Sequence, residues 1–214
     1  SNDLYLVKRN ANDVQYVKSI LLAEDIEDFF IGDFNADGWQ DLFYRFADSL
    51  ALLSFDPNTM ALSPAPQVVH FPERAFAFID LDTDGIGECI AHNSAGDLVI
   101  RKGIASSFSF ESPIIVDETT NSFGGPIQFW DMNGDNQLDI VRKISGNGYL
   151  WWWYPNNGNL NFGDKIQITN NLSGGAIAIV DLDLDGDLDG LSNNQVNNWS
   201  TNNILFYENV EGDG

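Results

Sequence analysis

One acidic nine-residue segment occurs four times in this chain of 214 residues, at nearly even spacing. The copies span residues 33–41, 80–88, 131–139 and 181–189, and their first residues are 47, 51 and 50 positions apart. A fixed period of that size indicates a repeat architecture in which each period is one supersecondary unit. This repeat constrains the fold more than any other feature of the sequence.

Short apolar runs surround each acidic segment. In the second period one run precedes the segment at 76–79, and three more follow at 89–91, 98–100 and 113–116. Short runs rich in β-branched and aromatic residues and separated by Ser, Gly and Asn are typical of strands. Four antiparallel strands in a unit of about 50 residues predict the blade of a β-propeller. The fold class we expect is all-β, a propeller-type array of about four such blades plus partial strands.

The repeat register also predicts boundaries within one propeller-type domain. Apolar spacing between Val14 and Phe30 is compatible with a helix, but the register favours strands at 5–7 and 16–17, the third and fourth strands of a preceding blade. Because the chain opens and ends inside a unit, we expect it to be part of a larger propeller; alternatively, the first strands complete the last sheet. The predicted parts are residues 1–26 (end strands of a preceding blade), 27–73, 74–124, 125–174 and 175–214 (an incomplete blade).

Oxygen donors lie at alternate positions of each acidic segment. We number the first Asp of a segment as position 1; side-chain oxygens then fall at positions 1, 3, 5 and 9, and position 7 can offer a backbone carbonyl. With water or a bidentate carboxylate, such a set reaches the six to eight oxygen ligands that Ca²⁺ accepts, whereas zinc would require His or Cys. We therefore expect up to four Ca²⁺ ions. The predicted ligands are Asp33, Asn35, Asp37, Trp39 and Asp41; Asp80, Asp82, Asp84, Ile86 and Glu88; Asp131, Asn133, Asp135, Gln137 and Asp139; and Asp181, Asp183, Asp185, Asp187 and Asp189.

Position 6 must adopt a positive φ if the chain is to wrap around an ion. Three segments place Gly there, and the third places Asn136, the next most tolerant residue. Glu88 is a larger departure at position 9, because its extra methylene changes the reach of the carboxylate.

Two alternatives compete with this interpretation. An EF-hand requires Glu at position 12, where this chain has Tyr44, Ala91, Arg142 and Ser192, and its flanks would be helical. Acidic turns that bind nothing are common, but packing so many carboxylates together without a cation would create several like-charge contacts. Four copies in register therefore favour metal binding.

Charge and composition exclude several classes of function. The formal net charge of −22 argues against nucleic acid or an anionic membrane as partner. No run of 18 apolar residues exists, so no membrane insertion is expected. The single cysteine, Cys89, excludes an intrachain disulfide and is expected to be a small buried side chain.

The pattern from Phe29 to Asp41, which reads FFIGDFNADGWQD, resembles the FG-GAP/VCBS repeat family, and WYPNNG at 153–158 and FYEN at 206–209 resemble the strand ends of those repeats. The resemblance covers nearly the whole chain. It implies a calcium-binding β-propeller of the kind found in integrin α heads and in many secreted bacterial proteins. It also implies that the ions at positions 1, 3, 5, 7 and 9 have chiefly structural roles.

The functional expectation is a non-enzymatic extracellular module of a larger secreted or surface protein that binds a protein or a glycan. The sequence contains no nucleophile, phosphate-loop or metalloprotease motif. The alternatives are a lectin-like module, an accessory domain of a secreted polysaccharide-active enzyme, and a structural spacer. Trp39 and Trp199 are candidate sugar-stacking residues, and the run 149–154 with three consecutive Trp is consistent with core packing or with a stacking surface.

Overall fold

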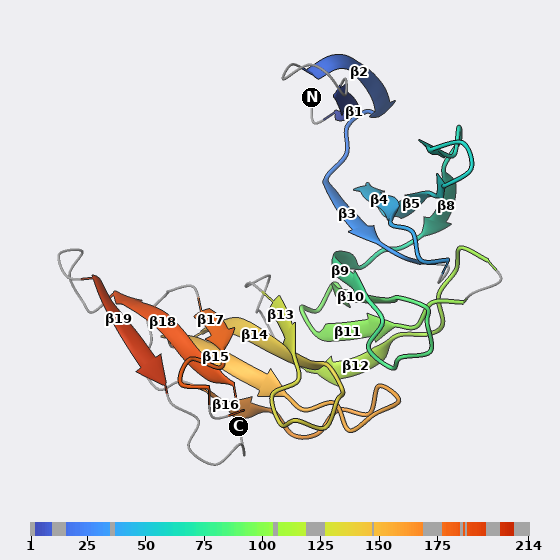
Figure 1. Cartoon of the computed structure of the whole chain (residues 1–214). Helices are drawn as coiled ribbons and strands as arrows, with labels where there is room; N and C mark the ends of the chain where they lie inside the picture. The colour runs from blue at the N-terminus through green and yellow to red at the C-terminus, as the bar shows by residue number, and fades with distance from the viewer. Residues whose placement is uncertain are drawn as a thin grey trace. The chain divides into compact units, whose positions relative to one another are not determined.

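The structure is a computed structural model that describes residues 3–9, 16–34, 37–104, 107–118, 127–146, 148–168, 177–184, 186, 188–195 and 202–207. These residues form strands and turns only (Figure 1). The described part of the chain contains no helix with the length and apolar character that a membrane span needs. The all-β prediction is confirmed.

Three four-stranded antiparallel sheets follow one another along the chain, and in each the strands are ordered as they occur in the sequence. A three-stranded sheet follows them and a two-stranded hairpin precedes them. The first sheet comprises β3 (Asp28–Gly32), β4 (Asp41–Phe46), β5 (Ser49–Leu53) and β8 (Gln67–His70); the second β9 (Arg74–Ile79), β10 (Glu88–His92), β11 (Leu98–Arg101) and β12 (Ile114–Asp117); the third β13 (Ile127–Trp130), β14 (Asp139–Gly146), β15 (Gly148–Tyr154) and β16 (Ile166–Gln167); the last β17 (Ile177–Val180), β18 (Asp189–Gln195) and β19 (Asn202–Tyr207); and the hairpin β1 (Leu4–Arg9) and β2 (Tyr16–Ala23).

Each acidic segment connects the first and second strands of its sheet, as the sequence predicted. The two strands leave the segment in antiparallel register, so that Gly32 pairs with Asp41 and Trp130 pairs with Asp139. The N-terminal strands also form as expected, which removes the helical alternative for this part of the chain. The proposed domain boundaries stay a prediction.

The chain divides into two compact units, Ser1–Asp80 with Gly85–Ser94 and Val99–Ile114, and Leu81–Asp84 with Ala95–Leu98 and Ile115–Gly214. The first unit has an aromatic core between the first two sheets. The rings of Phe43 and Phe78 stack there with centroids 4.0 Å apart, and Phe34 meets Phe43, Phe108 and Phe110 edge-on. Cys89 is fully buried in this core, as expected.

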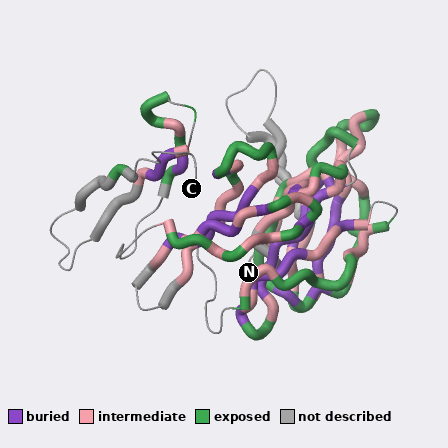
Figure 2. Tube along the Cα trace, turned by 90° about the horizontal axis from the view of Figure 1, so that it is seen from below, coloured by how far each residue is buried: buried purple, intermediate pink, exposed green. Residues whose placement is uncertain are grey.

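The second unit has its own core, in which Trp151 and Trp153 pack with Met132, Val141 and Ile179. Side chains alternate along a strand, so Trp152 faces the other way, where the Lys165 Nζ lies 5.3 Å from its ring. Core packing is therefore the role of two of the three consecutive tryptophans. Figure 2 shows in purple where the buried residues lie along the chain.

A short hairpin in the first unit was not expected. After β5 ends at Leu53, a further strand β6 (Phe55–Asp56) pairs with β7 (Ala61–Leu62) before the chain reaches β8. Asp56 caps the turn by accepting hydrogen bonds from the Asn58 backbone N–H and the Thr59 hydroxyl, both at 2.9 Å.

Candidate metal centre

The position-1 carboxylate closes the first three acidic loops from inside. In the third loop the Asp131 carboxylate accepts hydrogen bonds from the backbone N–H groups of Asp135 and Asn136, at 3.0 and 2.8 Å. Asp33 does the same in the first loop, with the N–H groups of Asp37 and Gly38. The loop is therefore bent around the first Asp by its own backbone.

Carboxylates further along the first and third loops order the following residues in the same way. The Asp37 Oδ1 accepts a hydrogen bond from the Trp39 N–H at 2.8 Å, and the Asp135 Oδ1 accepts one from Gln137 at the same distance. These are Asx-turn contacts, in which a short side chain bonds the backbone two residues on. In the third loop the second oxygen of Asp135 accepts a hydrogen bond from the Asn133 side-chain amide at 3.1 Å, so both oxygens of this carboxylate order the loop.

Backbone dihedrals confirm the prediction for position 6. Its φ is 85°, 89°, 66° and 104° in the four loops, at Gly38, Gly85, Asn136 and Gly186. Position 4 is also left-handed where it is described, with φ between 58° and 74° at Thr83, Gly134 and Leu184. The sequence analysis missed this second reversal, because only the third loop marks it with Gly. Thr and Leu rarely adopt such a φ, so the surrounding turn holds them there.

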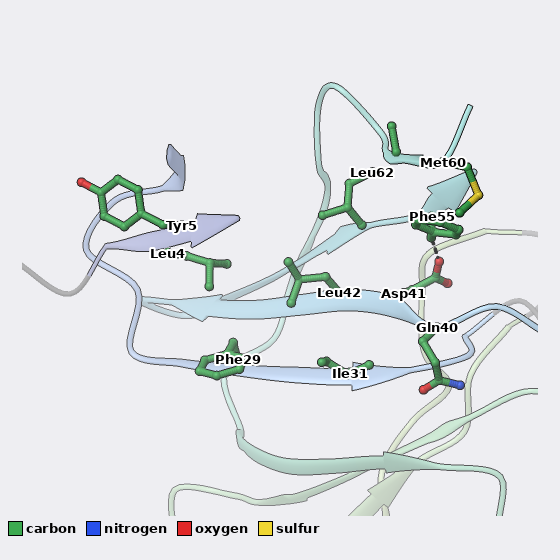
Figure 3. Close-up of a pocket in the computed structure, with 11 residues that line it drawn as sticks. Leu4, Tyr5, Phe29, Ile31, Gln40, Asp41, Leu42, Phe55, Met60 and Leu62 are labelled. Atoms are coloured by element: carbon green, nitrogen blue, oxygen red, sulfur yellow. Dashed lines mark hydrogen bonds between the residues drawn. The ribbon is translucent and has the colours of Figure 1, made fainter. Parts of the chain in front are cut away.

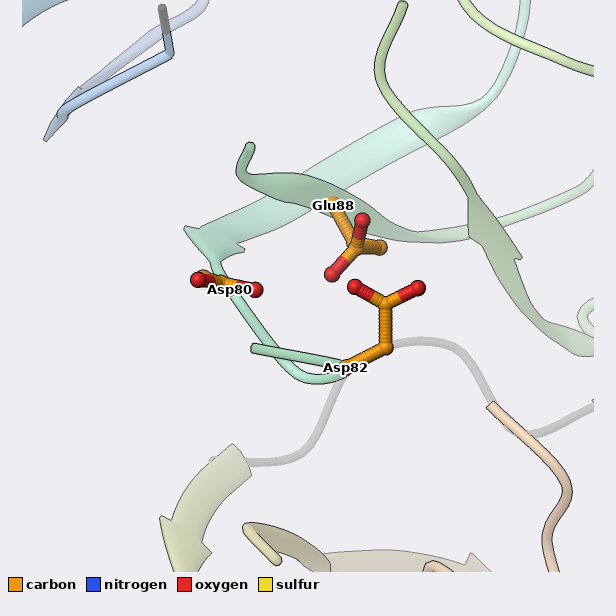
Figure 4. Close-up of side chains that lie close together, drawn as sticks. All are labelled: Asp80, Asp82 and Glu88. Atoms are coloured by element: carbon orange, nitrogen blue, oxygen red, sulfur yellow. The ribbon is translucent and has the colours of Figure 1, made fainter. Parts of the chain in front are cut away.

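Two loops bring three carboxylates together. One carboxylate oxygen from each of Asp80, Asp82 and Glu88 lies within 4.8 Å of the other two, and Asp181, Asp183 and Asp189 form an equivalent group. Figure 4 shows the Asp82 and Glu88 carboxylates turned toward each other, with Asp80 beside them. The longer Glu88 side chain thus reaches the position where the other loops have Asp.

The donor set of these two groups fits a hard divalent cation. Three carboxylates at this separation repel one another unless a cation or protons compensate, and Ca²⁺ is bound by such oxygens. The Asp80 Oδ1 and the Asp181 Oδ1 are buried and accept no hydrogen bond from any residue that the structure describes. Each is an oxygen with spare coordinating capacity, so both triads could hold a metal ion.

Position 9 has a second role in the first and third loops. The Asp139 carboxylate is buried and accepts hydrogen bonds from the N–H groups of Asn156, at 2.7 Å, and Met132, at 3.0 Å. Asp41 likewise accepts one from the Phe55 N–H at 2.9 Å. Burial raises the pKa of both carboxyls, against these hydrogen bonds, which lower it. These two residues therefore fasten the loop to the end of the third strand, whether or not an ion is bound.

Some predicted ligands cannot be placed. Asn35, Asp185, Asp187 and Trp199 lie outside the described residues. In the first and third loops position 3 is Asn, so no carboxylate triad of positions 1, 3 and 9 arises there. The ligand roles of these loops, and of the position-7 carbonyls, stay a prediction.

Trp39, one of the two predicted sugar-stacking residues, is exposed at position 7 of the first loop. Its ring is tilted against that of Phe55 with centroids 5.5 Å apart. Phe55 also lines a pocket on the first sheet together with Gln40 and Asp41 (Figure 3). The rest of the pocket is apolar: Leu4, Tyr5, Phe29, Ile31, Leu42, Met60, Ala61 and Leu62.

Asn156 is a site residue that the sequence analysis did not single out. It is fully buried, and its side-chain amide donates to the backbone carbonyls of Leu81, at 3.0 Å, and Leu138, at 3.2 Å. Leu81 is position 2 of the second acidic loop and Leu138 is position 8 of the third. The only available signal was its place in the WYPNNG segment, which marks a strand end but not a contact between loops.

Comparison with known proteins supports the fold. No family model matches the sequence, and no curated protein does. Among solved structures, the chain is similar to an Agrocybe aegerita lectin in a structure concerned with its specific recognition of non-reducing terminal N-acetylglucosamine. The TM-score is 0.61 at 16% identity, over 77% of this chain and 46% of the lectin chain. The chain thus spans less than half of the lectin's length, and the likeness shows a shared fold of repeated antiparallel sheets.

Proposed function

We propose that this chain is a non-enzymatic, lectin-like carbohydrate-binding module whose acidic loops bind Ca²⁺. The observation that carries the proposal is the similarity in fold to a lectin, since a lectin binds sugars without transforming them. The repeated sheets are then blades of a β-propeller, in keeping with the order of strands in each sheet. The lectin's ligand makes glycans that end in N-acetylglucosamine the first to test.

Calcium has a structural role in this proposal. Each triad lies where the first two strands of a sheet meet, so an ion held there fixes the hinge between them. Modest affinity would suffice in an extracellular setting, where EF-hand modules bind Ca²⁺ with Kd of about 10⁻⁴ to 10⁻³ M. We accordingly propose that the module works outside the cell, as part of a secreted or surface protein.

Trp39 is the candidate contact for the sugar. It lies on the turn that the Asp37 carboxylate caps, so a metal-ordered first loop would also order this indole. An exposed Trp beside a second aromatic ring offers a flat apolar surface for the C–H face of a pyranose, while the exposed Gln40 supplies a polar group nearby.

The test is binding of N-acetylglucosamine-terminated glycans, first on an array and then by calorimetry. We expect Trp39→Ala to weaken binding about tenfold or more, the loss that about 1.4 kcal/mol corresponds to. Trp130→Ala is the matched control, because Trp130 is another exposed tryptophan that ends β13 next to an acidic loop. An array on which no glycan binds in the presence of Ca²⁺ would contradict the proposal.

The pocket of Figure 3 favours a second candidate, a protein-binding or adhesion module. Phe29, Ile31 and Met60 are all more than half exposed on this face of the first sheet. A contiguous apolar surface of this kind is typical of protein contacts. If Ile31→Asp abolished capture of a protein partner while glycan binding was unchanged, this candidate would be favoured over the lectin.

A further inference from the structure

In the second and third sheets, one residue just after the third strand contacts two consecutive acidic loops. In the third sheet the residue at this place is Asn156, two positions after β15. Its backbone N–H donates to the Asp139 carboxylate, and its side-chain amide donates to Leu138 O, so it contacts positions 9 and 8 of its own loop. The same amide donates to Leu81 O, which belongs to the loop of the preceding sheet.

The junction between the first and second loops has the same arrangement of contacts, but the residue there is Gly103. Gly103 lies two positions after β11, and a Cβ added to it would be 2.7 Å from the Gly87 O, position 8 of the second loop. The same Cβ would be 3.2 Å from the Phe34 ring, position 2 of the first loop. One residue thus touches position 8 of its own loop and position 2 of the loop before it, at both junctions. Gly103 has no side chain to donate a hydrogen bond, whereas Asn156 makes three hydrogen bonds to the two loops at the second junction.

Position 2 lies between two metal-ligating positions, which gives the Asn156 contact its consequence. Leu81 stands between Asp80 and Asp82, two members of the triad, and its carbonyl belongs to the peptide group that leads into Asp82. Leu81 is fully buried, so this hydrogen bond is shielded from water. At the other end Asp139 closes the third loop by accepting the Met132 N–H. Asn156 is bonded both to Asp139 and to the Leu81 carbonyl. A change that tightens the third loop around Asp139 therefore acts, through Asn156, on the peptide group that joins Leu81 to Asp82.

We propose that Asn156 couples the second and third acidic loops, so that a cation bound by residues 131–139 strengthens cation binding by residues 80–88. The inference rests on the proposed calcium binding and adds the regulation of those sites. Asn156 is a positioning residue and ligates no ion itself. Coupling of this kind is reciprocal. A cation bound by the second loop must raise the cation affinity of the third loop by the same factor as a cation in the third loop raises that of the second.

The experiment is hydrogen–deuterium exchange of the full chain at increasing Ca²⁺, read by mass spectrometry in peptides that cover 80–88 and 131–139. Each loop gives its own midpoint concentration for protection. Asp131→Asn removes a ligand from the third loop only, and we expect it to raise the midpoint of 80–88 about fivefold, the lower end of typical couplings. Asp80→Asn should raise the midpoint of 131–139 by the same factor.

Variants of Asn156 test whether this residue carries the coupling. In an Asn156→Ala background, Asp131→Asn should shift the midpoint of 80–88 less than twofold, and Asn156→Asp, which keeps the size but lacks the amide donor, should behave alike. Asn157→Ala is the matched control: its side chain is exposed, and the fivefold shift should persist.

Each failure has its own meaning. If neither peptide gains protection with Ca²⁺, the proposed calcium binding is wrong, and the proposed coupling is wrong as well. If both peptides respond but Asp131→Asn leaves the midpoint of 80–88 unchanged in the chain with native Asn156, the coupling alone is overturned, and this result does not depend on the folding of any Asn156 variant. A fivefold shift that survives Asn156→Ala would also overturn the role of Asn156.

Discussion

The side-chain amide of Asn156 donates a hydrogen bond to the backbone carbonyl of Leu81 at 3.0 Å, across 75 residues of sequence. The contact joins the end of β15 to the acidic loop that precedes β10. The Asn156 side chain also donates to the Leu138 carbonyl and accepts from the Gly158 N–H. Both its amide nitrogen and its carbonyl oxygen are therefore hydrogen-bonded within the protein interior.

Replacing this amide should destabilise the fold. Asn156→Ala leaves the buried Leu81 carbonyl without this donor, which costs about 1–3 kcal/mol of unfolding free energy. Urea unfolding followed by circular dichroism measures the loss. Asn157→Ala, one residue away and exposed, should change the unfolding free energy by less than about 0.5 kcal/mol. Equal effects of the two substitutions would contradict the role assigned to Asn156.

Gly103 should tolerate no side chain. A Cβ there would lie 2.7 Å from the Gly87 carbonyl oxygen and 2.9 Å from the Ile86 Cγ2, and backbone cannot move aside as cheaply as a side chain. We expect Gly103→Ala to cost about 1–3 kcal/mol, the usual range for overpacking. Gly163→Ala is the control, since its Cβ would lie 3.3 Å from the flexible end of Asn157 and at an ordinary contact distance of 3.8 Å from Pro155. Thermal unfolding of the two variants side by side decides the point.

Tyr154 should make the protein sensitive to alkali. Burial, and then the hydrogen bond that its hydroxyl donates to Asp117 at 2.7 Å, raise the pKa of the phenol well above its ordinary value of 10.0. The pKa of the Tyr154 phenol is higher in the folded chain than in the unfolded chain. The stability that Tyr154 contributes is therefore complete below pH 10 and declines as the pH rises above 10. Unfolding free energies measured from pH 8 to 11 should show the decline.

Tyr154→Phe provides the comparison. Without the hydroxyl, Asp117 loses one hydrogen bond and keeps Lys165, whose Nζ lies 2.7 Å away, so we expect lower stability at neutral pH but a shallower loss above pH 10. A pH profile with the native slope would show that another group causes the alkaline sensitivity.

Ca²⁺ removal should loosen the loops that hold carboxylate triads. Each site that binds only the folded chain adds about 2.7 kcal/mol of stability when the ion concentration is 100 times its Kd. Chelation should therefore lower the melting temperature and increase proteolysis within 80–88 and 181–189. Asp82→Asn should remove part of the Ca²⁺-dependent stabilisation, whereas Asp56→Asn, on the turn between β6 and β7, should leave it unchanged.

The features that the sequence predicted are those that local chemistry determines. The strands followed from apolar runs between turn residues, and the positive φ of Asn136 and its three Gly equivalents followed from the need to reverse the chain within a few residues. The burial of Cys89 followed from its place in an apolar strand. Such features depend on neighbours in sequence, and a repeat shows them several times.

Contacts between distant segments could not be predicted in the same way. Nothing about Asn156 distinguishes it from Asn157 until Leu81 and Leu138 are placed beside it. The β6–β7 hairpin interrupts only one repeat, so the register offered no guide to it. The left-handed φ of Thr83 and Leu184 is imposed by the closure of the loop, against the ordinary preference of both residues.

Calorimetric titration of the metal-free chain with Ca²⁺, at ionic strength near 0.15 M, tests the central claim most directly. The account predicts saturable binding that Asp82→Asn combined with Asp183→Asn reduces by two sites, one for each triad, with no comparable effect of Asp56→Asn. Titration heats that never rise above the heat of dilution, together with one melting temperature in Ca²⁺ and in chelator, would contradict it.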